Sequence, residues 1–207
     1  MSSICMIVLT LAGEVPQQQG DYIGVDRGAL LLAEQGIPMR TAIGDFDSVP
    51  QESLDLIRAH AREMIRLNPV KDDSDSEAAV RLCAQRYDRM ILIGGIGGRI
   101  DHELVNLKLV GQYPSRLIMM NETNCIESRN EGIWPIERQG YQYVSFFPLT
   151  DAVISLRGFR YPLEQRHMNA DALYGLSNEL TGDSGELEVH RGRVLLIRSK
   201  DAQGGTE

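Results

Sequence analysis

Short apolar runs alternate with helical patterns along the first 120 residues of the chain. The runs that predict strands are ICMIVLTL, YIGV, TAI, MIRL, RMILIG and RLIMM. Between them lie RGALLLAEQG, PQESLDLIRAHARE, SEAAVRLCAQRY and DHELVNLKLVGQ, which favour helices. In SEAAVRLC the apolar residues Ala79, Leu82 and Cys83 follow the i, i+3, i+4 spacing of one helix face. This alternation predicts an α/β fold in which a mostly parallel sheet carries helices on both faces.

The pattern changes after about Asn121. The stretches YQYVSFFPL, AVISLRGF and GELEVHRGRVLLIRS are strand-like, and HRGR within the last is expected to be a hairpin turn. No long helical pattern follows. We therefore predict a Rossmann-like α/β domain over residues 1–123 and a small all-β domain over residues 124–207, with a frayed DAQGGTE tail.

The charge of the chain narrows the choice of ligand. Among 207 residues the formal net charge is −8, which makes the phosphate backbone of DNA or RNA a poor partner. An acidic chain can still bind a small phosphate ester through a divalent cation, and it favours a cationic substrate. We expect no nucleic-acid partner.

The cysteines and the first apolar run bear on the location of the protein. Cys5, Cys83 and Cys125 are odd in number and show no CxxC spacing, which argues for a reducing compartment and against a disulfide scaffold or structural zinc. No Lys or Arg precedes ICMIVLTLAG, so we interpret it as a buried strand rather than a signal peptide. No run approaches the roughly 20 residues of a membrane span. We expect a cytoplasmic protein without membrane contact.

Acidic residues gather where predicted strands end. In a parallel sheet the loops that follow these strands share the carboxyl edge, where such folds bind ligands. The residues are Asp26 after YIGV, Asp45 and Asp47 after TAI, Asp72, Asp73 and Asp75 in the KDDSD loop, and Asp101 after RMILIGG.

Helix capping is the alternative explanation for each of these acids taken singly. Asp47 or Ser48 can cap a helix that Pro50 opens, and Ser74 with Glu77 has the form of a capping box. Two carboxylates about 4 Å apart repel by roughly 4 kcal/mol at an effective dielectric constant of about 20, whereas a cap returns only about 1 kcal/mol. If the acids converge, a hard divalent cation is needed to hold them, and an all-oxygen ligand set suggests magnesium.

The stretch GGIGGRIDH supplies groups that bind phosphate. Its four glycines allow backbone amides to approach phosphate oxygens, and Arg99 can fork onto a phosphate. A helix that begins near Ile100 adds its positive end. The stretch is neither a GxGxxG dinucleotide fingerprint nor a P-loop, because it lacks the third glycine of the first and the GK[ST] of the second.

Taken together, these motifs resemble those of the thiamine pyrophosphokinase family. The matching stretches are VDRGALLL, IGDFDSV, KDDSDSEAAV, IGGIGGRIDHELVNL, LRGFRYPL and GLSNE, in the order of the family and over nearly the whole chain. The succession of GDFDS and GGRxDH is specific, although no single stretch is.

The resemblance implies an activity and an assembly. The family transfers diphosphate from ATP to thiamine, giving thiamine diphosphate and AMP, and requires Mg²⁺. Its α/β nucleotide-binding domain is followed by a β-sandwich that helps to bind thiamine. It acts as a homodimer whose thiamine site lies between the α/β domain of one subunit and the β domain of the other.

The resemblance also implies roles for individual residues. Catalytic residues are Asp45, Asp47, Asp75, Arg99 and Asp101, of which Asp45, Asp47, Asp75 and Asp101 hold the metal. We assign Asp26, Arg27, Lys71, Gly98, Arg99 and His102 to the ATP phosphates. Asp75, Tyr161, Ser177 and Asn178 fall on the thiamine side.

The departures from the family pattern are few. Arg27 stands where some relatives have glycine, Ser74 replaces a common threonine, and Tyr161 occupies a position that is tryptophan in some relatives. An aromatic face such as Tyr161 can stack on the thiazolium cation of thiamine. For Trp134 in GIWPI, we favour simple packing.

Two other functions fit part of the sequence. DFDSV also resembles the DxDx[TV] loop of aspartate-based, metal-dependent phosphatases, with Lys71 as their lysine. That loop normally follows the first strand, however, and it explains neither GGRIDH nor the β domain. A non-enzymatic thiamine or nucleotide sensor on the same scaffold would not need the complete set of carboxylates.

Overall fold

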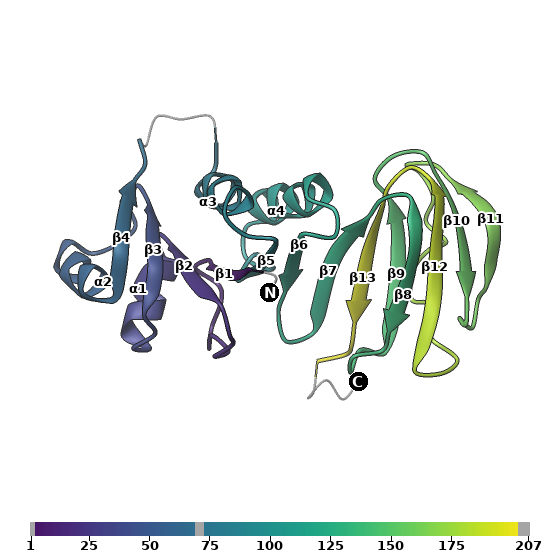
Figure 1. Ribbon diagram of the computed structural model, residues 1–207, viewed down its shortest axis with the longest axis horizontal. Helices are drawn as coiled ribbons and strands as arrows, with labels where there is room; N and C mark the ends of the chain where they lie inside the picture. The colour runs from purple at the N-terminus through teal and green to yellow at the C-terminus, as the bar shows by residue number, and fades with distance from the viewer. Residues whose placement is uncertain (1–2, 69–72, 203–207) are drawn as a thin grey trace. The chain divides into compact units, whose positions relative to one another are not determined.

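A computed structural model of the chain describes residues 3–68 and 73–202 and divides into two compact units (Figure 1). The first unit comprises Met1–Leu109 with Arg116–Asn121, and the second comprises Val110–Ser115 with Glu122–Glu207. The domain boundary predicted at residue 123 falls close to the change of unit after Asn121. No helix in the described part of the chain is long and apolar enough to cross a membrane.

The first unit contains six parallel strands in the order β4-β3-β2-β1-β5-β6. The chain therefore adds β2, β3 and β4 on one side of β1 and then returns to add β5 and β6 on the other side. The strands are β1 (Ile4–Val8), β2 (Asp21–Val25), β3 (Met39–Gly44), β4 (Ala61–Arg66), β5 (Arg89–Ile93) and β6 (Leu117–Met120).

Within the described residues four α-helices accompany this sheet, as the alternating pattern predicts. Met6 and Val8 of β1 belong to an apolar cluster that also includes residues of α1 and α2, whereas the free thiol of neighbouring Cys5 forms a hydrogen bond with Cys83 of α3. Successive side chains of a strand face opposite sides, so helices cover both faces. The helices are α1 (Arg27–Glu34), α2 (Leu54–His60, after the 3-10 turn η1, Gln51–Ser53), α3 (Asp75–Ala84) and α4 (Ile100–Gln112).

One helix is shorter than the sequence predicts. The pattern of PQESLDLIRAHARE suggested a helix through Glu63, but α2 ends at His60 and β4 begins at the next residue. Ala61 is already extended, with φ −104° and ψ 135°. Parallel pairing with β3, in which Met64 lies beside Ala42, therefore outweighs the helix propensity of this segment.

The second unit consists of antiparallel strands in two sets, β7-β13-β9 and β11-β10-β12-β8. One apolar cluster takes side chains from both sets, including Phe146, Ile154, Leu187 and Leu196. The strands are β7 (Asn124–Arg129), β8 (Gly132–Glu137), β9 (Tyr143–Pro148), β10 (Ala152–Arg157), β11 (Leu163–Met168), β12 (Ser184–Arg191) and β13 (Val194–Ser199).

The predicted HRGR hairpin is wrong. β12 pairs with β10 and β8, whereas β13 pairs with β7 and β9, so the turn carries the chain from one set of strands to the other. Gly192 in this turn has φ +84°, and a Cβ atom there would lie 2.2 Å from the carbonyl oxygen of Asp151. A close approach of two backbones therefore fixes the turn.

Trp134 of β8 packs within the second unit. The guanidinium carbon of Arg129 lies 4.9 Å from the centroid of its ring, and its indole N–H donates to the carbonyl of Asn130 at 3.0 Å. These contacts agree with the packing role favoured from the sequence.

Candidate active site

The ends of β2 and β3 hold the carboxyl group of Asp26. The backbone N–H of Asp26 donates to the carbonyl of Ile43 at 3.0 Å. Its Oδ1 accepts the backbone N–H of Phe46 at 3.1 Å. Asp26 and Phe46 have φ values of 48° and 59°, which are uncommon for residues other than glycine. The local backbone thus bends to bring this carboxyl group against the loop after β3.

Gly44 makes this arrangement possible. It is the last residue of β3, and a Cβ atom at this position would lie 1.8 Å from Oδ1 of Asp26. No side chain fits at residue 44 while Asp26 keeps its place.

Three carboxylates converge next to this point. Asp26, Asp45 and Asp75 each offer an oxygen atom, and the three atoms lie within 4.8 Å of one another. All three residues are partly buried. We call them the acidic trio. The sequence placed Asp45 and Asp75 at the metal and Asp26 at the ATP phosphates, whereas the structure groups all three.

The electrostatics of the acidic trio favour a cation. The pKa of Asp26 is raised to about 7, mainly by burial and further by the hydrogen bond and charge of Asp75, against the opposing N–H of Phe46. Near neutral pH the metal-free group therefore retains a proton that an ordinary aspartate would lose. Clustered carboxylate oxygens of this kind are the ligands that hard divalent cations prefer, so the trio fits such an ion.

Asp75 is positioned by the start of α3. Oγ of Ser74 accepts the backbone N–H of Glu77 at 3.2 Å, which confirms Ser74 as the helix N-cap. The carboxylate of Glu77 pairs with Arg81. Ser74 therefore caps α3, and the carboxylate of Asp75 can take part in the acidic trio at the same helix end.

The glycine-rich loop follows β5 and is held by α4. Glu103 Oε2 accepts the N–H of Gly97 at 2.9 Å, and Asn106 Nδ2 donates to the carbonyl of Gly95 at 3.1 Å. The amide of Gly97 is thus occupied by a side chain of the protein. The four glycines of this loop line a cavity.

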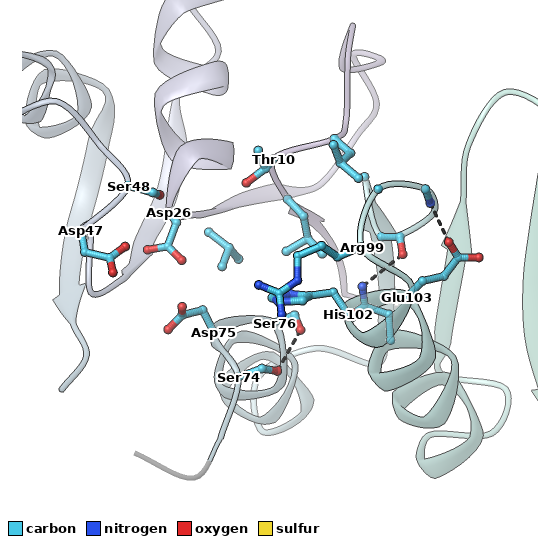
Figure 2. Close-up of a pocket in the computed structure, with 18 residues that line it drawn as sticks. Thr10, Asp26, Asp47, Ser48, Ser74, Asp75, Ser76, Arg99, His102 and Glu103 are labelled. Carbon is cyan, nitrogen blue, oxygen red and sulfur yellow. Dashed lines mark hydrogen bonds between the residues drawn. The ribbon is translucent and has the colours of Figure 1, made fainter. Parts of the chain in front are cut away.

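The carboxyl ends of β1, β2 and β5 surround a cavity of about 590 Å³ (Figure 2). It lies where the strand order reverses, which is the usual ligand site of parallel sheets. Leu9, Thr10 and Leu11 line it after β1, and the glycine-rich loop lines it after β5. The predicted residues that line it are Asp26, Asp47, Asp75, Gly98, Arg99 and His102.

Arg99 and Asp101 bind each other. Nε and Nη2 of Arg99 donate to the two oxygens of Asp101 at 3.1 and 2.5 Å. This bond with Arg99 holds the pKa of Asp101 at about 2. Asp101 also accepts the backbone N–H of His102 at 3.0 Å. It is not part of the acidic trio, and it borders a smaller hollow beside the cavity.

Three further residues were assigned to phosphate or metal, namely Asp45, Arg27 and Lys71. Asp45 completes the acidic trio and accepts the N–H of Asp47 at 3.0 Å. Arg27 is exposed at the start of α1 and is not among the cavity-lining residues. Lys71 and Asp72 lie outside the described residues.

The residues assigned to thiamine belong to the second unit. Tyr161 is 58% exposed, and the guanidinium of Arg160 lies 5.6 Å from its ring centroid. Ser177 has φ 52° and donates its N–H to Ser145 Oγ at 2.9 Å. Asn178 is buried; its Oδ1 accepts the N–H of Tyr161 at 3.1 Å, and its Nδ2 donates to the carbonyl of Tyr161 at 2.8 Å. The amide of Asn178 therefore fixes Tyr161.

Several cavity residues were not predicted. Thr10 follows β1 at the same edge as the acids, whereas the sequence placed it inside the predicted strand ICMIVLTL. Glu103 and Asn106 stand four and seven residues after Arg99, a helical spacing that could have grouped them on one face of α4. Ser48 and Ser76 flank predicted acids and carry no signal of their own.

Known proteins share both the sequence and the fold. The thiamin pyrophosphokinase catalytic domain matches residues 15–120, and the thiamin pyrophosphokinase vitamin B1 binding domain matches residues 133–194. The chain belongs to the thiamin pyrophosphokinase family. Its resemblance to the family is thereby confirmed, and neither the phosphatase nor the sensor alternative is favoured.

Individual relatives agree with this membership. The chain is 31% identical over 187 residues to thiamine pyrophosphokinase of Bacillus subtilis, covering 87% of each chain. It superposes on the crystal structure of a thiamin pyrophosphokinase family protein from Enterococcus faecalis with a TM-score of 0.87, 27% identity, and coverage of 97% of this chain and 100% of that one. The corresponding values for the Bacillus subtilis crystal structure are 0.86, 27%, 97% and 100%.

Proposed function

We propose that this member of the thiamin pyrophosphokinase family transfers the diphosphate of ATP to the hydroxyl of thiamine and releases AMP. The observation that carries the proposal is a cavity whose lining brings Asp26 and Asp75 of the acidic trio together with a glycine-rich loop and Arg99. Phosphoryl-type transfer asks a protein mainly for positioning and for neutralisation of charge. The cavity offers groups for both.

Asp26, Asp45 and Asp75 would hold the magnesium ion, with Asp47 nearby at the cavity wall. When bound, the ion neutralises charge on the phosphate oxygens. Asp75 also orients the attacking hydroxyl of thiamine toward the β-phosphorus of ATP.

Arg99 binds the transferred phosphates. A guanidinium group has five N–H donors, and Asp101 engages one on Nε and one on Nη2, which leaves three for a phosphate. We assign to Asp101 the task of orienting Arg99 rather than of holding the metal. Gly98 and His102 line the cavity on either side of Arg99 and contact the phosphates with it.

The second unit supplies the thiamine side. Tyr161 stacks on the thiamine ring system, Ser177 bonds to it, and Asn178 keeps Tyr161 in place. We propose that the first unit is a Rossmann-like nucleotide-binding domain and the second a β-sandwich that binds thiamine. As the family resemblance implies, two subunits would combine these domains into shared sites.

Free, buried Cys5, Cys83 and Cys125 suit a cytoplasmic location.

Product analysis tests the proposed function. Purified protein is incubated with ATP and Mg²⁺, with and without thiamine, and nucleotides and phosphates are separated by chromatography. We expect AMP and thiamine diphosphate only when thiamine is present. Release of free phosphate from ATP, or AMP formation that is independent of thiamine, would contradict the proposal.

A further inference from the structure

Glu103 places a carboxylate in the cavity away from the acidic trio. It comes from the first turn of α4 and lines the cavity wall. In the view of Figure 2, Arg99 is drawn between Glu103 on one side and Asp26 and Asp75 on the other. The cavity thus has an acidic end, a cationic middle and a second end at Glu103.

The charge of Glu103 restricts what can lie against it. A carboxylate repels phosphate oxygens, so the phosphates of a nucleotide belong at Arg99 and not here. A carboxylate can accept about four hydrogen bonds. The N–H of Gly97 supplies one, and within the described residues no second donor reaches the side chain of Glu103. Its remaining acceptor sites suit a ligand that donates hydrogen bonds.

The ribose of ATP carries such donors at the right place. Glu103 binds Gly97, which directly precedes the Gly98–Arg99 segment that we assign to the phosphates. In ATP the group next to the phosphates is the ribose, whose 2′- and 3′-hydroxyls are hydrogen-bond donors. Carboxylates accept from ribose hydroxyls in other nucleotide sites as well.

We propose that Glu103 accepts hydrogen bonds from the ribose hydroxyls of ATP and thereby selects ribonucleotides over deoxyribonucleotides. This inference rests on the proposed function, because it assumes that ATP occupies the cavity. Glu103 is a specificity-determining residue in this account and takes no part in the transfer itself.

The neighbouring contacts hold Glu103 ready for this role. Its bond to Gly97 fixes the carboxylate before any ligand arrives. Asn106, 5% exposed, bonds to the carbonyl of Gly95 in the same loop. Two side chains of α4, Glu103 and Asn106, therefore hold the loop that carries Gly97. A preorganised acceptor loses little freedom on binding and discriminates strongly against a ligand that lacks the hydroxyl.

The test measures binding without turnover. Isothermal titration compares AMP, 2′-deoxyAMP, 3′-deoxyAMP and IMP on the wild type, on Glu103→Gln and on Asn106→Ala. We expect the wild type to bind AMP about tenfold or more tightly than either deoxy analogue, the order expected for a hydroxyl bonded to a charged acceptor. Glu103→Gln should reduce this ratio to about threefold or less, mainly by weakening AMP. Asn106→Ala removes the bond to Gly95 and loosens the loop but keeps the Glu103 carboxylate, so it should weaken all four ligands by similar factors and preserve the ratio.

Four results would overturn the inference. Equal affinity of the wild type for AMP and both deoxy analogues would exclude hydroxyl recognition. Equal weakening of AMP and the deoxy analogues in Glu103→Gln would mean that Glu103 only positions the loop. A change in the ratio of AMP to IMP affinity in Glu103→Gln, with the deoxy ratio intact, would move the contact to the base. If the wild type binds none of the four ligands, the inference fails, while product analysis with ATP and thiamine tests the proposed function independently.

Discussion

The carboxyl group of Asp26 accepts the backbone N–H of Phe46 at 3.1 Å and so joins the end of β2 to the loop after β3. The same loop carries Asp45, and the start of α3 brings in Asp75. One hydrogen bond therefore ties together two of the three segments that form the acidic trio.

The stability of the metal-free protein should depend on pH through Asp26. The pKa of this group is raised from 3.8 to about 7 in the folded chain, so the folded state retains a proton that the unfolded state releases. Stability contributed by this group is present below about pH 4 and is lost as the pH rises to about 7. Asp26→Asn keeps the acceptor for Phe46 and should flatten that fall.

Thermal unfolding in a chelator between pH 4 and 8 measures this effect. We expect the midpoint of the wild type to fall relative to that of Asp26→Asn across the window, and added Mg²⁺ to reduce the difference. Parallel profiles of the two proteins would show that Asp26 does not retain the proton.

Gly44→Ala should abolish activity by displacing the Asp26 carboxyl group. A Cβ atom 1.8 Å from Oδ1 cannot be accommodated without movement, and overpacking of this kind costs about 1–3 kcal/mol. Gly36→Ala is the matched control, because Gly36 also has positive φ but no atom within 4 Å of an added Cβ. It should cost about 1 kcal/mol and leave kcat unchanged. Urea unfolding and initial rates give both quantities; full activity in Gly44→Ala would contradict the placement of Asp26.

Asp101→Asn separates the two roles considered for Asp101. If Asp101 orients Arg99, Asp101→Asn should raise the KM for ATP. Arg99→Lys, which keeps the charge but loses the planar fork, should raise it in the same way. The concentration of Mg²⁺ that gives half-maximal activity should not change. An increased requirement for Mg²⁺ in Asp101→Asn would return Asp101 to the metal ligands implied by the family resemblance.

Shared active sites predict complementation between inactive chains. Asp45→Asn damages the first unit and Ser177→Ala the second, so a mixed dimer with shared sites has one doubly damaged and one intact site. After subunit exchange, a pure heterodimer should regain up to about half of the wild-type activity. The absence of any recovery at every mixing ratio would mean that each chain builds its own site.

Much of the fold was predictable because apolar runs in the first unit directly reflect buried parallel strands. The second unit was harder to predict. β11, LEQRHM, is an edge strand with exposed Glu164, Gln165 and Arg166, so it shows no apolar alternation. The turn at Gly192 could be recognised as a turn, but its sequence does not tell which strands it joins.

The residues of the candidate site could largely be predicted from the sequence, but the contacts between their side chains could not. Residues after parallel strands converge at one edge, which is why Asp45 and Asp75 could be grouped in advance. The position of Asp26 depends on the missing side chain of Gly44, a contact between neighbouring strands. Arg99 binds Asp101, and this contact depends on side-chain conformation, which spacing does not encode.

The fate of an oxygen atom tests the central claim most directly. Thiamine labelled with ¹⁸O in its hydroxyl group is incubated with ATP, Mg²⁺ and the protein, and the products are analysed by mass spectrometry. Attack of this hydroxyl on the β-phosphorus predicts equal amounts of AMP and thiamine diphosphate, with the label retained in thiamine diphosphate and absent from AMP. Label in AMP, or AMP accompanied by free diphosphate instead of thiamine diphosphate, would contradict the account.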